Sequence, residues 1–289
     1  MNFSMYANFY KSVQAHGIDA AADQAVSLGF SSVEFFDFVS PTWVRTVPDR
    51  EAAEQMRRAL EARSLSVACY SVAVNLYEEG MTPDTVTEAE RALMHYAEMS
   101  AALGSPYLHH TLLLGLPRLP NLSIEDALDA ILPAVVRVAR YARDLGVTCI
   151  YEDQGTYFNG VEGFGVFFRA IKKECPWVGV CGDVGNVLFV DESPVEFFRA
   201  YAKDMLHVHI KDYIKAETPD GTNGWAASLG GTYLKDWIIG EGCVNVRACL
   251  EILRDVGYRG AIALENGHEP DFSEGCRIAM QLCKDTLSE

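Results

Sequence analysis

The chain has 289 residues and a formal net charge of −16, with 24 Lys and Arg against 40 Asp and Glu. Binding a nucleic-acid backbone draws on clustered basic residues, so this balance argues against a nucleic-acid partner. No stretch approaches the roughly 18 uninterrupted apolar residues of a membrane span, and the first residues lack a basic and apolar leader, so we expect a cytoplasmic protein without a membrane partner. The 8 cysteines form no CxxC pair, which is typical of free thiols in a reducing compartment.

Short apolar runs rich in Val, Ile, Ala and Cys predict buried parallel strands. They lie at residues 2–7, 32–36, 66–72, 107–113, 148–153, 178–183, 205–211 and 260–266. Amphipathic segments predict helices at residues 18–28, 50–63, 88–103, 124–145, 162–173, 194–202, 246–256 and 272–287. This alternation predicts an α/β fold, a single (β/α)8 TIM barrel, with residues 1–289 forming one domain.

Four acidic or histidine residues stand near the ends of the last four predicted strands: Glu152, Asp183, His209 and Glu265. A single carboxylate at a strand end is usually a helix cap or a solvated loop residue. The carboxyl ends of neighbouring parallel strands converge, however, so three carboxylates and one imidazole should face a common point. Such a set is typical of one divalent metal ion, which we expect to be Mn²⁺, with Mg²⁺, Co²⁺ or Zn²⁺ as alternatives.

Neighbouring residues are candidates for substrate contacts. Lys211 follows His209 by two and should share its side of the strand. His109 and His110 point to opposite sides, so one of them should reach the pocket, and we assign His110 to the substrate site as a hypothesis. Three further residues complete the local set: Tyr6 at the end of the first strand, His207 as a buried core residue, and Glu34, which either points into the barrel or caps a turn.

The longest irregular stretch, residues 212–245, follows the seventh strand and should cover the site. Within it, Trp225 is a candidate substrate contact that would stack on the ligand with Tyr233 and Trp237. Asp212 should orient His209 or hold a neighbouring loop, and Glu241 should fix the turn before the next helix. Beyond Glu265, His268 should be exposed. Few basic residues lie near this face, which favours a substrate without phosphate, although residues 230–232 (Gly-Gly-Thr) weakly resemble an anion-binding turn.

Several of these pieces together resemble the xylose isomerase-like TIM barrels. This group includes ketose 3-epimerases, hydroxypyruvate isomerases, inosose dehydratases and, more distantly, apurinic endonucleases. The resemblance rests on Glu152, the segment from Asp183 to Asn186, the segment from His209 to Asp212, the turn at residues 240–242, and Glu265. It implies that Glu152, Asp183, His209 and Glu265 bind one divalent ion, and that Glu152 and Glu265 form the catalytic acid–base pair.

One position departs from the family pattern. Many members carry His where this chain has Asn186, three residues after the metal-binding Asp. Asn donates and accepts hydrogen bonds but is a poor metal ligand and not an acid or base near neutral pH. This argues against a three-zinc nuclease site, and we assign Asn186 to substrate binding.

The resemblance implies a sugar isomerase or epimerase that abstracts a proton next to a ketone through a metal-stabilised enediolate. Its substrate would be a small sugar, polyol or ketone, and the protein a homodimer or homotetramer. One alternative is a metal-dependent lyase on the same barrel, either an inosose-type dehydratase or a glycoside eliminase. A second is a sugar-binding barrel without catalysis, against which the intact Glu152 and Glu265 count.

Overall fold

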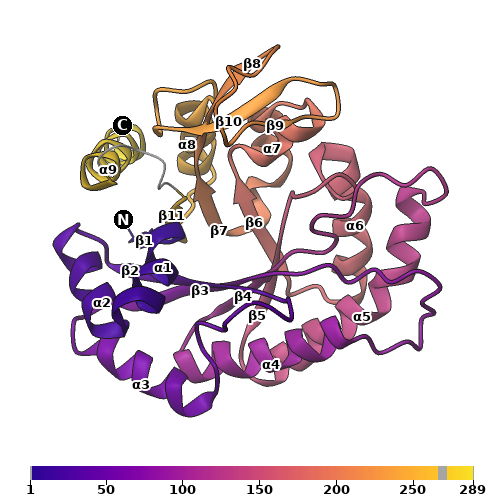
Figure 1. Ribbon diagram of the computed structural model, residues 1–289, viewed down its shortest axis with the longest axis horizontal. Helices are drawn as coiled ribbons and strands as arrows, with labels where there is room; N and C mark the ends of the chain where they lie inside the picture. The colour runs from indigo at the N-terminus through magenta and orange to yellow at the C-terminus, as the bar shows by residue number, and fades with distance from the viewer. Residues whose placement is uncertain (1, 266–271, 289) are drawn as a thin grey trace.

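A closed barrel of parallel strands forms the centre of the computed structural model, which describes residues 2–265 and 272–288 (Figure 1). In sequence order, its strands are β1 (Asn2–Met5), β2 (Ser32–Phe38), β3 (Ser66–Ala73), β4 (Tyr107–His110), β5 (Thr148–Glu152), β6 (Gly179–Asp183), β7 (Met205–Ile210) and β11 (Ala261–Leu264). Each strand pairs in parallel with the next, and β11 closes the ring by pairing with both β7 and β1. The predicted TIM barrel is confirmed.

Helices follow the strands and surround the barrel (Figure 1). They are α2 (Ile18–Ser27), α3 (Arg50–Glu61), α4 (Glu88–Leu103), α5 (Ile124–Asp144), α6 (Gly160–Glu174), α7 (Pro194–Tyr201), α8 (Val246–Asp255) and α9 (Phe272–Ser288). Asp49, Thr87 and Ser123 cap the starts of α3, α4 and α5, each accepting a backbone N–H bond. At the end of α4, Gly104 takes a left-handed φ of 76° and closes the helix as the sequence predicts.

One helix was missed by the sequence interpretation. Helix α1 (Ala7–His16) begins directly after β1 and ends at Gly17, whose φ of 82° separates it from α2. Its buried residues are Phe9 and Val13, so its apolar stripe is too short to stand out as a periodic pattern. The predicted extension of the first strand to residue 7 is therefore wrong, because Ala7 already belongs to the helix.

The stretch predicted to be irregular after the seventh strand contains a small antiparallel sheet. Its strands are β8 (Asp212–Ala216), β9 (Ala226–Ala227) and β10 (Tyr233–Trp237), in the order β8–β10–β9. Figure 1 places this sheet over one side of the barrel, near α7 and α8. Two 3₁₀ helices, at Asn186–Val190 and Ala202–Asp204, complete the described elements. No helix of the described residues is long and apolar enough to cross a membrane.

The side chains inside the barrel are small or polar near the site. Cys69, Ile150 and Cys181 form an apolar cluster inside the barrel, while the main core lies between the strands and the helices. Ala261 and Ala263 precede Glu265 on the same side of its strand, and both are buried. These small side chains leave room at the carboxyl ends of the strands for the groups described next.

Candidate metal centre

The four predicted ligands converge at the carboxyl ends of four adjacent strands. Glu152 ends β5, Asp183 ends β6 and pairs in register with His209 in β7, and Glu265 follows β11. His209 Nδ1 lies 2.8 Å from Glu152 Oε1 and 3.9 Å from Glu265 Oε2. Ligand atoms of Glu152, Asp183 and His209 all lie within 4.8 Å of one another. The structure therefore brings together the residues that the sequence singled out.

Lys211 places a buried positive charge among these carboxylates. Its Nζ lies 3.0 Å from Asp183 Oδ2, 2.8 Å from Glu265 Oε2 and 3.1 Å from Asn186 Oδ1. Burial alone would lower the pKa of Lys211, but Asp183 and Glu265 raise it well above its usual value. Lys211 thus shares the site with His209, as the strand period predicts, and carries its full charge there.

Asn186 contributes an amide to the same place. Its Oδ1 accepts the bond from Lys211, while its Nδ2 is buried and has no hydrogen-bond partner among the residues that the structure describes. A buried donor without a partner costs free energy unless a ligand or a water molecule satisfies it. The arrangement is consistent with the predicted role of Asn186 in substrate binding.

Glu34 fixes the orientation of the histidine ligand. This carboxylate is fully buried and lies 3.0 Å from His209 Nε2 and 2.7 Å from His207 Nε2. Glu34 accepts the Nε2–H, and Nδ1 faces Glu152 and Glu265, so Nδ1 is the nitrogen that would give up its proton to bind a cation. The sequence left the direction of Glu34 open, and the structure points it into the barrel.

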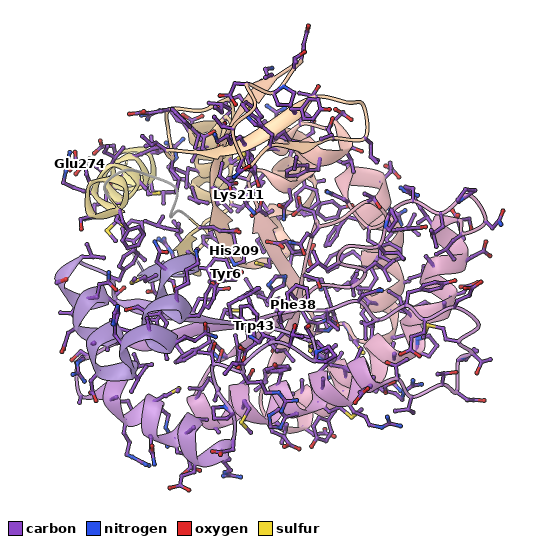
Figure 2. The ribbon with its side chains drawn as sticks, in the orientation of Figure 1. Tyr6, Phe38, Trp43, His209, Lys211 and Glu274 are labelled. Atoms are coloured by element: carbon purple, nitrogen blue, oxygen red, sulfur yellow. The ribbon has the colours of Figure 1, made fainter. Side chains whose placement is uncertain are left out.

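An aromatic ring also restrains the histidine. Tyr6 stacks on His209 with ring centroids 4.7 Å apart and planes inclined by 18°, and Figure 2 shows the two close together below Lys211. Tyr6 is buried, and burial raises the pKa of its hydroxyl well above the usual value, so it stays neutral. The predicted place of Tyr6 at the site is consistent with this contact.

Of the two histidines that end β4, His109 faces the site. Its Nδ1 lies 2.8 Å from Ser71 Oγ, and its Nε2 lies 3.7 Å from Glu152 Oε2. His110 instead packs edge-on against the ring of Tyr151, with its Nδ1 2.9 Å from the Thr111 carbonyl oxygen. The assignment of His110 to substrate binding is therefore wrong, because the strand pleat turns it away from the metal centre.

Two other assigned residues lie apart from the ligands. Trp225 donates its indole N–H to Asp220 Oδ1 and carries Lys235 Nζ 5.7 Å above its ring, so its polar contacts are with neighbours in its own loop. Glu241 is exposed, and the turn at residues 240–244 is held by a different carboxylate. His268, predicted to be exposed, lies outside the described residues.

The carboxylate that holds the turn at residues 240–244 is Asp212. Its two oxygens accept backbone N–H bonds from Tyr213, Gly240, Gly242 and Val244, each 2.8 or 2.9 Å long. A Cβ at Gly242 would lie 2.1 Å from Asp212 Oδ1, so only glycine allows this approach. Of the two roles considered for Asp212, the structure supports holding the loop.

The carboxylates of the site differ in their readiness to take up a proton. Burial on its own would raise the pKa of Glu152, but His109 and His209 lower it to about 2. Burial, and to a lesser extent the nearby Asp183, raises the pKa of Glu265, and the positive charge of Lys211 offsets this only in part. The resulting pKa is about 7. Without a metal ion, Glu152 is thus the more acidic carboxylate of the pair, and Glu265 holds a proton more readily.

The donor set fits one divalent cation. Glu152, Asp183 and His209 form a cluster of candidate ligands, and Glu265 Oε2 lies 3.9 Å from His209 Nδ1, so the set is rich in oxygen. Glu34 supplies the hydrogen bond to Nε2 that metal-binding histidines usually have. Asp183 Oδ2 is buried, and its partner among the described residues is the Lys211 ammonium at 3.0 Å, which a divalent cation would replace. The residues that would hold the ion are Glu152, Asp183, His209 and Glu265.

Comparison with known proteins identifies the fold family. Residues 22–283 match the model of the xylose isomerase-like TIM barrel. The chain belongs to this family. An inosose dehydratase from Clostridium botulinum is 21% identical over 238 residues, which cover 78% of this chain and 77% of that protein. Further inosose dehydratases match over about half of their length or less.

Solved structures of the xylose isomerase-like family superpose on nearly the whole chain. An L-ribulose 3-epimerase has a TM-score of 0.73 at 14% identity, over 100% of this chain and 95% of that one. A family member from Mycobacterium smegmatis, solved in complex with magnesium, has a TM-score of 0.66 at 18% identity, over 93% of this chain and 89% of that one. These likenesses establish the fold.

Proposed function

We propose that this protein is a divalent-metal-dependent isomerase or epimerase of a small sugar, polyol or ketone. The observation that carries the proposal is the pair Glu152 and Glu265, two carboxylates whose oxygens lie 2.8 and 3.9 Å from His209 Nδ1 at one candidate cation site. Two carboxylates at one cation can take a proton from a carbon beside a ketone and return it. Family members that act on sugars, including the matched epimerase, agree with this substrate class.

A divalent cation, with Mn²⁺ as our expectation, would stabilise the negative charge that develops on a ketone oxygen as the neighbouring proton leaves. The chain supplies the rest of the chemistry. Glu265 lines the open cavity and accepts or returns the proton, while Glu152 serves the opposite transfer. Lys211 and the Asn186 amide orient the substrate hydroxyls. Burial raises the pKa of Asp183, and the positive charge of Lys211 offsets this only in part.

A lyase is the second candidate function. The curated relatives that match include inosose dehydratases, and a dehydratase needs the same proton abstraction followed by loss of a hydroxyl group. The proton that a carboxylate of the pair has removed would be returned to the departing hydroxyl, which leaves as water; Lys211 Nζ lies 2.8 Å from Glu265 Oε2. The two functions therefore share every residue named above and differ in what leaves the substrate.

The mass of the product distinguishes an isomerase or epimerase from a lyase. The Mn²⁺-loaded protein is incubated with a panel of ketoses, hydroxypyruvate and inosose, and the products are analysed by chromatography with mass spectrometry. An isomer or epimer has the mass of its substrate, whereas a dehydration product is lighter by one water. A new peak of unchanged mass, absent without metal and in Glu265→Gln, supports the proposal. Loss of water supports the lyase instead, and metal-dependent binding without any product indicates a sugar-binding barrel.

A further inference from the structure

A large cavity continues outward from the metal centre. Its volume is about 650 Å³, and its polar end is formed by Glu265, Lys211 and Asn186. Sites of roughly 300–1,000 Å³ usually enclose ligands of drug size. A simple sugar fills only part of such a space, so the remaining volume has to accommodate another portion of the ligand.

The outer part of this cavity is lined mainly by apolar side chains. They come from three separate loops: Leu116 and Pro117 after β4, Phe189 after β6, and Leu229 and Leu234 in the β8–β10–β9 region. Leu229 is 53% exposed, which is high for a leucine that lines a cavity beside a polar site. Its apolar surface is available to a ligand and would leave water when one binds.

The position of Leu229 is fixed by a set of hydrogen bonds around Asp191. Asp191 Oδ1 accepts from Ser228 Oγ at 2.6 Å, and Oδ2 accepts from the Gly230 amide at 2.6 Å. The Leu229 amide itself donates to the Phe189 carbonyl oxygen at 2.9 Å. A Cβ at Gly230 would lie 2.8 Å from Asp191 Oδ2, so glycine is needed there. These contacts hold an exposed leucine rigidly over the cavity.

The same contacts argue against a phosphate in the outer cavity. The Gly-Gly-Thr turn that resembles an anion site already donates its Gly230 amide to the Asp191 carboxylate. Among the cavity-lining residues that the structure describes, Lys211 is the one basic side chain, and it lies at the polar end between Asp183 and Glu265. A phosphate farther out would have no basic partner among these lining residues.

We propose that the cavity binds a sugar or polyol that carries an apolar substituent, such as an aromatic ring; glycosides, whose anomeric carbon is blocked, serve below as probes of binding. The hydroxylated part lies at Glu265, Lys211 and Asn186, and the substituent packs among Leu116, Phe189 and Leu229. This inference rests on the proposed function, which places the sugar at the metal centre. Asn186 Nδ2 and Gln154 Oε1 are buried without partners and give the ligand a donor and an acceptor between the two parts.

Paired glycosides test this inference. Binding of methyl and phenyl glycosides of the same sugars, including D-glucose, D-galactose and D-allulose, is measured by titration calorimetry on Mn²⁺-loaded protein. We expect at least one phenyl glycoside to bind about tenfold more tightly than its methyl partner, because the ring leaves water. Leu229→Ser should reduce this preference at least fivefold without changing the affinity for the methyl glycoside. Leu145→Ser, which changes an exposed leucine outside this cavity, is the matched control.

Equal affinities for every pair, or no binding by either member, would overturn the inference, as would an equal effect of the two serine variants. Proton exchange on unsubstituted ketoses is measured in parallel. Metal-dependent exchange without a phenyl preference would remove the apolar subsite and leave the proposed function intact. A phenyl preference that Leu229→Ser reduces, without exchange on any ketose, would support the subsite and remove the proposed function.

Discussion

The hydrogen bond from His209 to Glu34 should control metal affinity. Glu34 accepts from His209, His207 and Ser71, and all of these groups are buried. In Glu34→Gln the side chain keeps its shape but loses its charge, and its amide nitrogen cannot accept a hydrogen bond. At least one of the three donors then loses its acceptor, and the negative charge that holds the Nε2 proton of His209 is gone.

The expected size of the effect follows from that loss. A hydrogen bond to a charged group contributes about 1.5–3 kcal/mol, and the partners of metal-binding histidines typically account for about 10–100-fold in affinity. We therefore expect Glu34→Gln to bind Mn²⁺ about 10–100-fold more weakly than the wild type. Titration calorimetry on metal-free protein measures this directly, and unfolding midpoints without metal report any general loss of stability.

Glu90→Gln is the matched control for this variant. Glu90 is also a fully buried glutamate, but it pairs with Arg137 at 2.7 Å on the outside of the barrel. Its replacement should lower the free energy of unfolding while leaving the Mn²⁺ affinity unchanged. The reasoning about Glu34 is refuted if Glu34→Gln binds Mn²⁺ as tightly as the wild type, or if both variants lose affinity equally.

Three further changes test other parts of the site. Lys211→Met should bind Mn²⁺ at least as tightly as wild type in calorimetry, because the ammonium no longer competes for Asp183 and Glu265; weaker binding would contradict this. Asp212→Asn should lose about 3 kcal/mol of stability and speed hydrogen exchange at residues 212–244, and unchanged exchange would argue against its role as the anchor of the loop. Burial lowers the pKa of His110 to about 4, so the unfolded chain takes up its proton first as the pH falls below about 6.5. Between pH 7 and 5 this proton uptake lowers the free energy of unfolding of the wild type by about 2 kcal/mol. In denaturant unfolding, the free energy of unfolding of His110→Gln should fall by that much less over the same pH range.

The barrel and the convergence of the four candidate ligands could be predicted because both depend on local patterns. Each strand is a short apolar run, and the residue at its carboxyl end is placed by the strand period alone. Parallel pairing then brings Glu152, Asp183, His209 and Glu265 together without further information. Glu34 had the same signal, a carboxylate inside an apolar strand. Its partners His207 and His209 lie 173 and 175 residues away along the chain, so the local pattern did not give its direction.

The wrong assignments concern features that depend on distant contacts. Whether His109 or His110 faces the barrel is decided by the register between β3 and β4, in which Ser71 pairs with His109. The small sheet β8–β10–β9 depends on pairing across a loop, with Leu234 opposite Lys215, and its strands are too short to give a periodic signal. The sequence therefore could not assign the position of Trp225, and it offered two roles for Asp212 without deciding between them.

The reaction that we propose is the removal of a proton next to a ketone at the metal centre. The most direct measurement is deuterium incorporation by proton NMR, with Mn²⁺-loaded protein in D₂O and the panel of ketoses, hydroxypyruvate and inosose. We expect exchange at the carbon beside the carbonyl of at least one compound. This exchange should be lost on removal of the metal and in both Glu152→Gln and Glu265→Gln. Exchange that persists in both variants, or no exchange on any compound while Mn²⁺ is bound at the four ligands, would contradict it.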